Sequence, residues 1–115
     1  LQHISRQLEI IFRQEDIYGR IGGEEFAFSI VIEDGKHAKY IGERICQEIE
    51  EQPIMLANKN IHITVSIGLC INYPEEFPVT LKHAMKQADL CLYKAKHSGK
   101  NCVVTTDDDQ CTPAA

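Results

Sequence analysis

The feature that most constrains the fold is an alternating run between positions 61 and 71. Apolar side chains occupy every second position, and polar or small residues stand between them: Ile61, Ile63, Val65, Ile67, Leu69 and Ile71 against His62, Thr64, Ser66, Gly68 and Cys70. Because side chains alternate between the two faces of a strand, this pattern predicts a long strand with one buried face. An upstream strand at 54–57, joined to it around Asn58-Lys59-Asn60, would complete a hairpin.

Helical spacing of apolar residues predicts three helices around this strand. The first covers residues 1–14, the second follows Asp34-Gly35 and ends before Pro53, and the third runs from an N-cap at Thr80 to a C-cap at Gly99. The apolar faces that we expect are Ile4, Leu8, Ile11 and Phe12; Ala38, Ile41, Ile45 and Ile49; and Leu81, Ala84, Met85, Ala88, Leu92 and Ala95.

Further strands are expected at 16–21, 25–33 and 101–105, followed by a disordered acidic and polar tail at 106–115. Strand pairs that resemble hairpins therefore alternate with helices along the chain. This order predicts an α+β domain over residues 1–105, with a mainly antiparallel central sheet flanked by helices.

Composition excludes several classes of function. The chain has 115 residues, enough for one core, and a net charge of −5. This charge argues against nucleic acid or an anionic membrane as a partner, because both bind clustered positive charge. No apolar run approaches the roughly 18 residues of a membrane-spanning helix. The five cysteines contain no Cys-x-x-Cys pair, which favours free thiols for most of them and a reducing cytoplasm.

The candidate chemistry of the chain lies in Gly22-Gly23-Glu24-Glu25, between two of the expected strands. Two glycines allow a ligand to approach the backbone, and adjacent carboxylates are hard oxygen ligands of the kind that Mg²⁺ prefers. The turn is therefore a candidate seat for a metal-bound nucleotide phosphate. The alternative is an ordinary acidic hairpin turn, because glycines and acids are also the usual residues of turns.

This turn and several further segments resemble the GGDEF family of diguanylate cyclases. Gly22-Gly23-Glu24-Glu25-Phe26 is similar to the family signature in its Glu-for-Asp form. The other matching segments are Arg20, Thr64-Val65-Ser66-Ile67-Gly68, the pattern from Asp89 to Lys96, and Ser98-Gly99-Lys100-Asn101. The resemblance spans about residues 1 to 105 and implies the C-terminal two-thirds of a nucleotidyl-cyclase, palm-like domain without its N-terminal strand and helix.

The resemblance implies condensation of two GTP molecules into the second messenger cyclic di-GMP, with release of pyrophosphate, in a homodimer whose subunits each present one GTP. It implies Mg²⁺ or Mn²⁺ as the cofactor, with Glu24 as a metal ligand and Glu25 as its supporting acid. Which of the two assists deprotonation is left open. Gly22 and Gly23 would let the hairpin pass close to the nucleotide.

By the same resemblance, Lys96 and Lys100 would bind the β- and γ-phosphates of GTP as mobile point charges. The alternative for both lysines is a favourable position near the negative end of a helix dipole. Asp89, on the same helix, is expected to have a structural role.

A second expected site is formed by Arg13 and Asp16, which match the family's RxxD product-inhibition motif. Arginine binds phosphate or a guanine edge through paired hydrogen bonds, and a carboxylate accepts from guanine N–H donors. The pair is therefore expected to bind cyclic di-GMP and restrain the enzyme, with Arg44 as a secondary contact. The alternative is a solvated pair of charges at a helix end.

The resemblance also implies residues that these positions lack. The family's first strand with a metal-binding Asp, and the Asn and Asp that recognise guanine, have no substitute in residues 1–15. We therefore expect the 115 residues alone to be inactive and poorly stable, and the parent to be an active cyclase. That parent is expected to be cytoplasmic, or the cytoplasmic part of a membrane-bound or sensor-linked protein. The alternative is a non-catalytic module that binds cyclic di-GMP or GTP.

Overall fold

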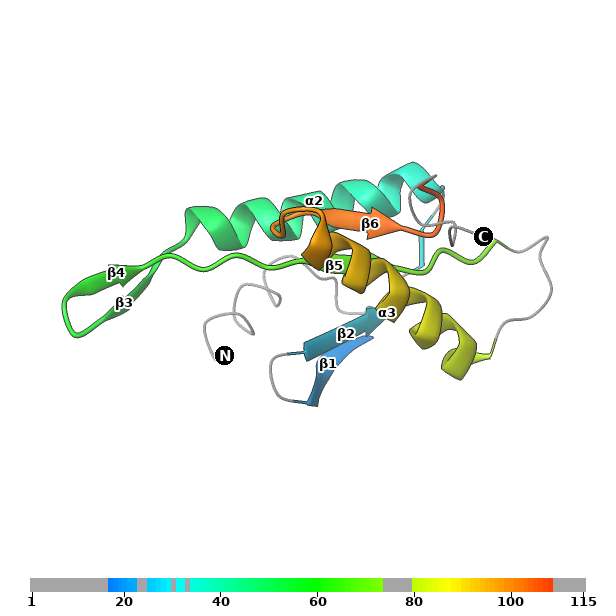
Figure 1. Cartoon of the computed structure of the whole chain (residues 1–115), viewed down its shortest axis with the longest axis horizontal. Coiled ribbons are helices and arrows are strands. Elements are labelled where there is room, and N and C mark those ends of the chain that lie inside the picture. Colours follow the sequence, from blue (N-terminus) through cyan, green and yellow to red (C-terminus); the bar gives the residue numbers. More distant parts are fainter. Residues whose placement is uncertain (1–16, 23–24, 30, 33, 74–79, 109–115) are drawn as a thin grey trace. The chain divides into compact units, whose positions relative to one another are not determined.

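The computed structural model describes residues 17–22, 25–29, 31–32, 34–73 and 80–108. The chain divides into two compact units, Leu1–Glu33 and Asp34–Ala115 (Figure 1). The described elements are β1 (Ile17–Gly22), β2 (Glu25–Ser29), α2 (Gly35–Glu51), β3 (Ile54–Leu56), β4 (Lys59–Ile61), β5 (Ile67–Leu69), α3 (Leu81–His97) and β6 (Val103–Thr105). This order confirms the α+β class. The helix expected at 1–14 lies outside the described residues.

The first unit contains the antiparallel hairpin of β1 and β2. Its register runs from Ile17 opposite Ser29 to Gly22 opposite Glu25, with an irregularity between Arg20 and Gly22. The second strand was expected to reach residue 33, whereas β2 ends at Ser29, the residue opposite Ile17. Both hairpin strands are otherwise where the sequence predicts them.

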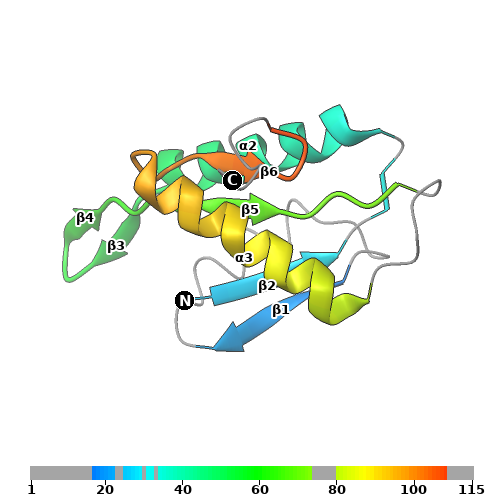
Figure 2. The ribbon, with the colours of Figure 1, turned by 45° about the vertical axis from the view of Figure 1, so that its right-hand side comes forward.

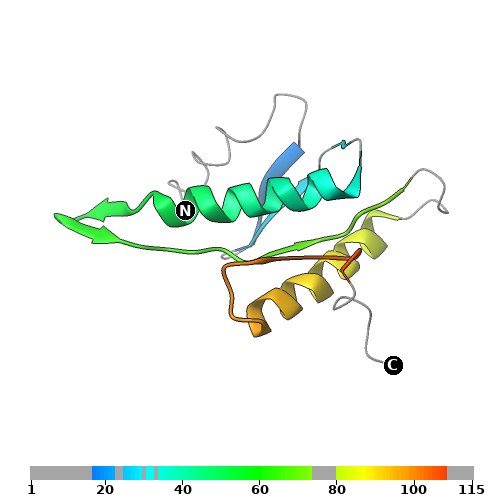
Figure 3. The ribbon, with the colours of Figure 1, turned by 90° about the horizontal axis from the view of Figure 1, so that it is seen from above.

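The second unit is built on β5 and β6, which pair in parallel from Ile67 opposite Val103 to Leu69 opposite Thr105. Helix α2 lies on one side of this pair and α3 on the other (Figure 3). Two of the three described strand pairings are antiparallel, as expected, and this one is the exception. A parallel pair needs a long crossover, and α3 lies within the connection from β5 to β6.

Glycines permit close approach of both helices to this pair, which lies between α2 and α3 (Figure 2). A Cβ at Gly42 of α2 would lie 2.9 Å from Val103 Cγ1, and a Cβ at Gly68 of β5 would lie 2.7 Å from Leu92 Cα on α3. On the side of α3, Val104 packs with Cys91 and Ala95 in a buried cluster. Successive residues of β6 therefore face opposite helices, as alternation along a strand requires.

Helix α2 begins where Asp34 caps it, with Asp34 Oδ1 accepting a 3.0 Å hydrogen bond from His37 N. It ends at Glu51, two residues before Pro53, as the sequence predicts. The buried stripe consists of Ala38, Gly42, Ile45, Cys46 and Ile49, so the predicted face is confirmed apart from Ile41, which is half-buried.

Helix α3 is capped by Thr80, whose Oγ1 accepts a 3.1 Å hydrogen bond from His83 N. The C-cap is Ser98, and Gly99 follows it with a φ of 106°. The expectation that Leu81 and Met85 point inward is wrong, because their side chains are 76% and 38% exposed. The stripe that packs on the strands instead comprises Ala88, Cys91, Leu92 and Ala95.

The long strand expected at 61–71 is divided between two sheets. Its start belongs to β4, which pairs with β3 through a turn at Ala57 and Asn58, and its later part is β5, which pairs with β6. Residues 62–66 belong to no strand. Since β3 is short and β6 begins opposite Ile67, no described strand pairs with the intervening stretch. The alternation still shows there, because Ile63 and Val65 are half-buried while His62 and Thr64 are exposed.

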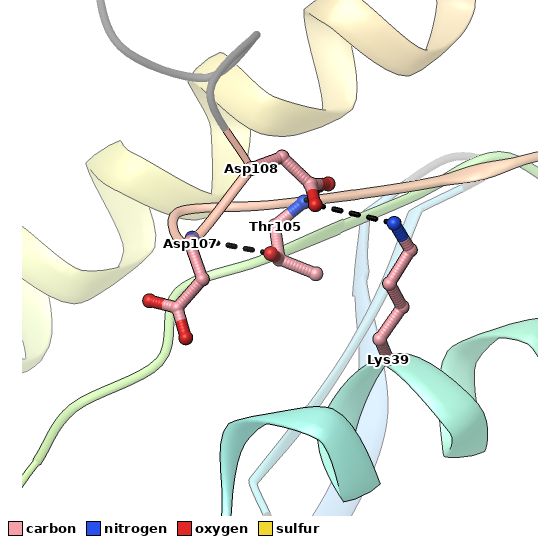
Figure 4. A network of polar contacts seen from close by, with 4 residues as sticks. All are labelled: Lys39, Thr105, Asp107 and Asp108. Carbon is pink, nitrogen blue, oxygen red and sulfur yellow. Dashed lines mark hydrogen bonds and ion pairs between the residues drawn. The ribbon is translucent and has the colours of Figure 1, made fainter.

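The described residues continue past β6 to Asp108, and residues 106–108 fall within the segment that we expected to be a tail. Thr106 N donates to Leu69 O at 2.9 Å, and Ile71 N donates to Thr106 Oγ1 at 2.9 Å. Asp108 accepts from Thr105 N at 2.8 Å and pairs with Lys39 Nζ at 3.2 Å (Figure 4). These contacts fasten the end of β6 to β5 and α2. Residues 109–115 lie outside the described part.

Two further expectations concern the cysteines and the membrane. Cys46, Cys70 and Cys102 are not disulfide-bonded, as expected for most of the cysteines, whereas Cys91 is disulfide-bonded. Within the described residues, neither helix is long and apolar enough to cross a membrane.

Candidate functional site

The acidic turn lies at the end of the β1–β2 hairpin. The register pairs Gly22 with Glu25, so Gly23 and Glu24 are the two residues that connect the strands. These two residues lie outside the described part of the chain. Adjacent glutamates at the end of a hairpin supply oxygen donors that suit Mg²⁺ or Mn²⁺. Elsewhere in the described residues, no group of three or more His, Cys, Asp or Glu side chains is gathered in a way that could hold a metal ion.

The second candidate group lies at the end of α3 in the other unit. Lys96 stands in the last turn of the helix, Lys100 follows its end, and both side chains are exposed. The two lysines share this region with Lys94 and His97, which are also in the last turn. Cations are stabilised here by the negative end of the helix dipole.

The backbone after α3 holds Lys100 in a defined position. Lys100 N donates to Ala95 O at 3.1 Å, the six-to-one bond of a Schellman motif, with Gly99 as the left-handed residue. Lys100 and Asn101 also have positive φ, at 62° and 48°. Glycine adopts this region freely and asparagine tolerates it, but lysine is disfavoured there.

Asn101 links this turn to two other segments. Its backbone N–H donates to Ser66 Oγ at 3.2 Å, and its side-chain Nδ2 donates to Glu50 Oε2 on α2. Its Oδ1 is buried and has no hydrogen-bond partner among the described residues. Sequence reasoning assigned no role to Ser66, Asn101 or Glu50. The signal for the first two was their place within family-like motifs, whereas nothing in the sequence singled out Glu50.

A groove of about 500 Å³ lies between α2 and residues 101–103, and its lining includes Glu43, Cys46, Glu50 and Asn101. Burial and, to a smaller extent, the nearby Cys102, Glu43 and Glu50 together raise the pKa of the Cys46 thiol to about 11. The Cys46 Sγ donates to Val65 O at 3.5 Å. The thiol is therefore protonated at neutral pH and is not an activated nucleophile.

The remaining predicted residues belong to the expected product-inhibition site. Arg44 is exposed on α2, and Arg13 and Asp16 lie outside the described residues. The structure therefore brings Lys96 and Lys100 together at one helix end, and Gly22 and Glu25 together at the end of one hairpin. These two groups belong to separate units.

The family model described as "Diguanylate cyclase, GGDEF domain" matches residues 1–102. This match places the chain in a family of nucleotidyltransferase enzymes. The chain belongs to the GGDEF domain family of diguanylate cyclases.

Individual relatives agree with this assignment. Diguanylate cyclase A of Treponema denticola is 31% identical over 110 residues, which are 95% of this chain and 29% of that protein. The probable diguanylate cyclase DgcF of Escherichia coli K12 is 30% identical over 103 residues, which are 88% of this chain and 33% of that protein. The chain therefore spans about a third or less of the length of these relatives.

The fold agrees with a solved structure of the family. The GGDEF domain of DgcB from Caulobacter crescentus, solved in complex with c-di-GMP, superposes with a TM-score of 0.82 at 25% identity. The match covers 93% of this chain and 63% of that one.

Proposed function

We propose that the protein is a diguanylate cyclase that condenses two GTP molecules into cyclic di-GMP. The observation that carries the proposal is the family match over residues 1–102, which includes the complete glycine and glutamate turn at 22–25. The β1–β2 register supports it, because it sets this turn at the end of a hairpin. In the reaction, the 3′-oxygen of each GTP attacks the α-phosphorus of the other, and each attack releases one pyrophosphate.

In this proposal Glu24 and Glu25 hold a divalent cation, Mg²⁺ or Mn²⁺, and one of them accepts the proton of the attacking hydroxyl. When bound, the cation neutralises charge on the triphosphate. Gly22 and Gly23 carry no side chains, so the nucleotide can approach the backbone of the turn. In this proposal the turn therefore contributes two carboxylates and a backbone that the nucleotide can approach closely.

Lys96 and Lys100 are proposed to bind the β- and γ-phosphates. Both side chains are exposed. Among the described residues, the ion pair is between Lys39 and Asp108, so no described carboxylate neutralises either of these two lysines. A phosphate bound between them would gain two charge-assisted hydrogen bonds.

The proposal extends to assembly and regulation. Two subunits of a homodimer would each present one GTP, since the product joins two nucleotides. Arg13 and Asp16, assisted by Arg44, are proposed to bind cyclic di-GMP and inhibit turnover. The 115 residues alone are proposed not to turn over GTP, because their acidic turn supplies only two candidate metal ligands. The cytoplasm, where GTP is available, is the proposed compartment.

Substitution of the two glutamates tests this function. With its natural flanking sequence, the protein should form cyclic di-GMP from GTP and Mg²⁺, and Glu24→Gln with Glu25→Gln should lower kcat by at least about 100-fold, as expected when charge stabilisation is lost at a reacting centre. Glu43→Gln, on the exposed side of α2, is the matched control and should keep wild-type activity. Binding of GTP or cyclic di-GMP without turnover in the wild type would instead support a regulatory module.

A further inference from the structure

The turn after α3 contains an unusual backbone sequence. Gly99, Lys100 and Asn101 have φ values of 106°, 62° and 48°, so three successive residues lie in the left-handed region. Gly99 meets no steric resistance there, and asparagine is among the residues that tolerate it. Lys100 has neither advantage. A residue held in a disfavoured conformation persists only where its surroundings fix it, and such residues cluster at functional sites.

The position of Lys100 within the helix-ending motif is also unusual. In a Schellman motif this position often carries an apolar residue that packs back on the last turn. Here it carries a lysine whose side chain is exposed. The choice of residue therefore does not serve local packing, and it presents a positive charge beside Lys96.

The contacts that fix this turn pass through Asn101. The backbone N–H of Asn101 donates at 3.2 Å to the hydroxyl of Ser66, which lies just before β5. The side-chain amide of Asn101 donates to Glu50, near the end of α2. Two segments that are far apart in the sequence thus hold the residue next to Lys100. In the described residues, Glu50 is engaged with this amide and forms no ion pair with either lysine.

We propose that Asn101 is a positioning residue for phosphate binding: the Glu50–Asn101–Ser66 contacts hold Lys100 in its left-handed conformation beside Lys96. This inference rests on the proposed function, because it takes the two lysines as the binding site for the outer phosphates of GTP. Asn101 itself does not touch the nucleotide. Asn101 keeps the turn with Lys100 ordered before GTP binds, so less conformational entropy is lost on binding.

The test uses the protein with its natural flanking sequence and measures both the Kd for Mg-GTP and the steady-state kinetics of pyrophosphate release. Asn101→Gly keeps a residue that accepts positive φ but removes the bond to Glu50. It should raise Kd and KM about 5-fold and leave kcat unchanged. A change of this size lies within the range of interaction free energies measured between residues in contact. Glu50→Ala should have the same effect, whereas Glu50→Gln, which retains an acceptor oxygen, should behave like the wild type.

Two controls separate positioning from a general loss of structure. Gln47→Ala removes another side-chain hydrogen bond on α2, from Gln47 Nε2 to Glu51 Oε1 at 3.1 Å, and should not change Kd. In a Lys100→Ala background, Asn101→Gly should weaken GTP binding by less than about 2-fold, because the group that it positions is already absent.

The outcomes distinguish the inference from the proposed function. An equal loss of affinity from Asn101→Gly with and without Lys100, or a normal Kd in both Asn101→Gly and Glu50→Ala, would overturn the inference. Tight GTP binding with the predicted coupling but no cyclic di-GMP would contradict the proposed function alone. A Kd for GTP that Lys100→Ala leaves unchanged would overturn the inference together with the proposed role of that lysine.

Discussion

Gly68 of β5 lies directly against the backbone of Leu92 on α3. A Cβ built at Gly68 would lie 2.7 Å from Leu92 Cα and would overlap Leu92 N and the Ala88 carbonyl oxygen. These are backbone atoms of a helix, which cannot move aside as the end of a side chain can. The glycine is therefore required for α3 to pack on the strand, and α3 in turn carries Lys96.

Gly68→Ala should strongly destabilise the second unit because it forces α3 away from β5. We expect a loss of about 3 kcal/mol or more in the free energy of unfolding, at the upper end of overpacking effects. Gly35→Ala is the matched control, since its Cβ would meet Tyr73 and Asp107 side-chain atoms that can rotate away. That variant should change stability by less than about 1 kcal/mol. Urea unfolding of both variants measures the difference, and equal stabilities would contradict the packing described.

Much of this arrangement follows from local patterns in the sequence. The start of α3 is set by the cap at Thr80, and the end of α2 by Pro53, which lacks a backbone N–H. Both effects act within a few residues. Likewise, the hairpin that pairs Gly22 with Glu25 follows from a short turn between two apolar runs.

The sequence predicts less where partners come from far along the chain. The run at 61–71 reads as one strand, but its pairing changes from β3 to β6, and strand partners are not encoded in alternation. The outward position of Leu81 depends in the same way on where α3 meets β5. For the candidate site, motifs identify Lys96 and Lys100, whereas the contact between Glu50 and Asn101 depends on the folded chain.

The β3–β4 turn offers a stabilising substitution. Ala57 and Asn58 connect the strands with φ values of 50° and 62°, the positive values that a type I′ turn requires. Alanine is poorly suited to this region, so Ala57→Asn combined with Asn58→Gly should stabilise the second unit by about 1 kcal/mol. Thermal unfolding measures the gain. The same pair of changes should leave GTP affinity unaltered, and a lower melting temperature would contradict the turn geometry.

The Cys46 thiol predicts a pH dependence of stability. Its pKa is about 11 in the folded chain and 9.0 when unperturbed, so between these values the unfolded chain releases a proton that the folded chain retains. Stability from this group is complete below pH 9 and falls as pH rises toward 11, by on the order of 2 kcal/mol. In Cys46→Ala, the free energy of unfolding should no longer show this fall between pH 9 and 11. Parallel unfolding curves for both proteins across that interval would show that the thiol is not desolvated.

Product inhibition should depend on the arginine of the RxxD motif. Arg13→Ala should raise the cyclic di-GMP concentration for half-inhibition by about 10-fold or more, since a paired charge-assisted contact is lost. Arg44→Ala should have a smaller effect in the same direction. Arg6→Ala, which changes an arginine outside the motif, is the control and should be inhibited like the wild type. Equal inhibition of all four proteins would remove the proposed second site.

The most direct test of the proposed function is the identity of the product formed from GTP. The protein with its natural flanking sequence, incubated with labelled GTP and Mg²⁺, should yield cyclic di-GMP and two pyrophosphates for each product molecule. Glu24→Gln with Glu25→Gln should slow the formation of both by at least about 100-fold. Formation of a cyclic mononucleotide, or GTP that stays intact under conditions in which it binds, would contradict the assignment as a diguanylate cyclase.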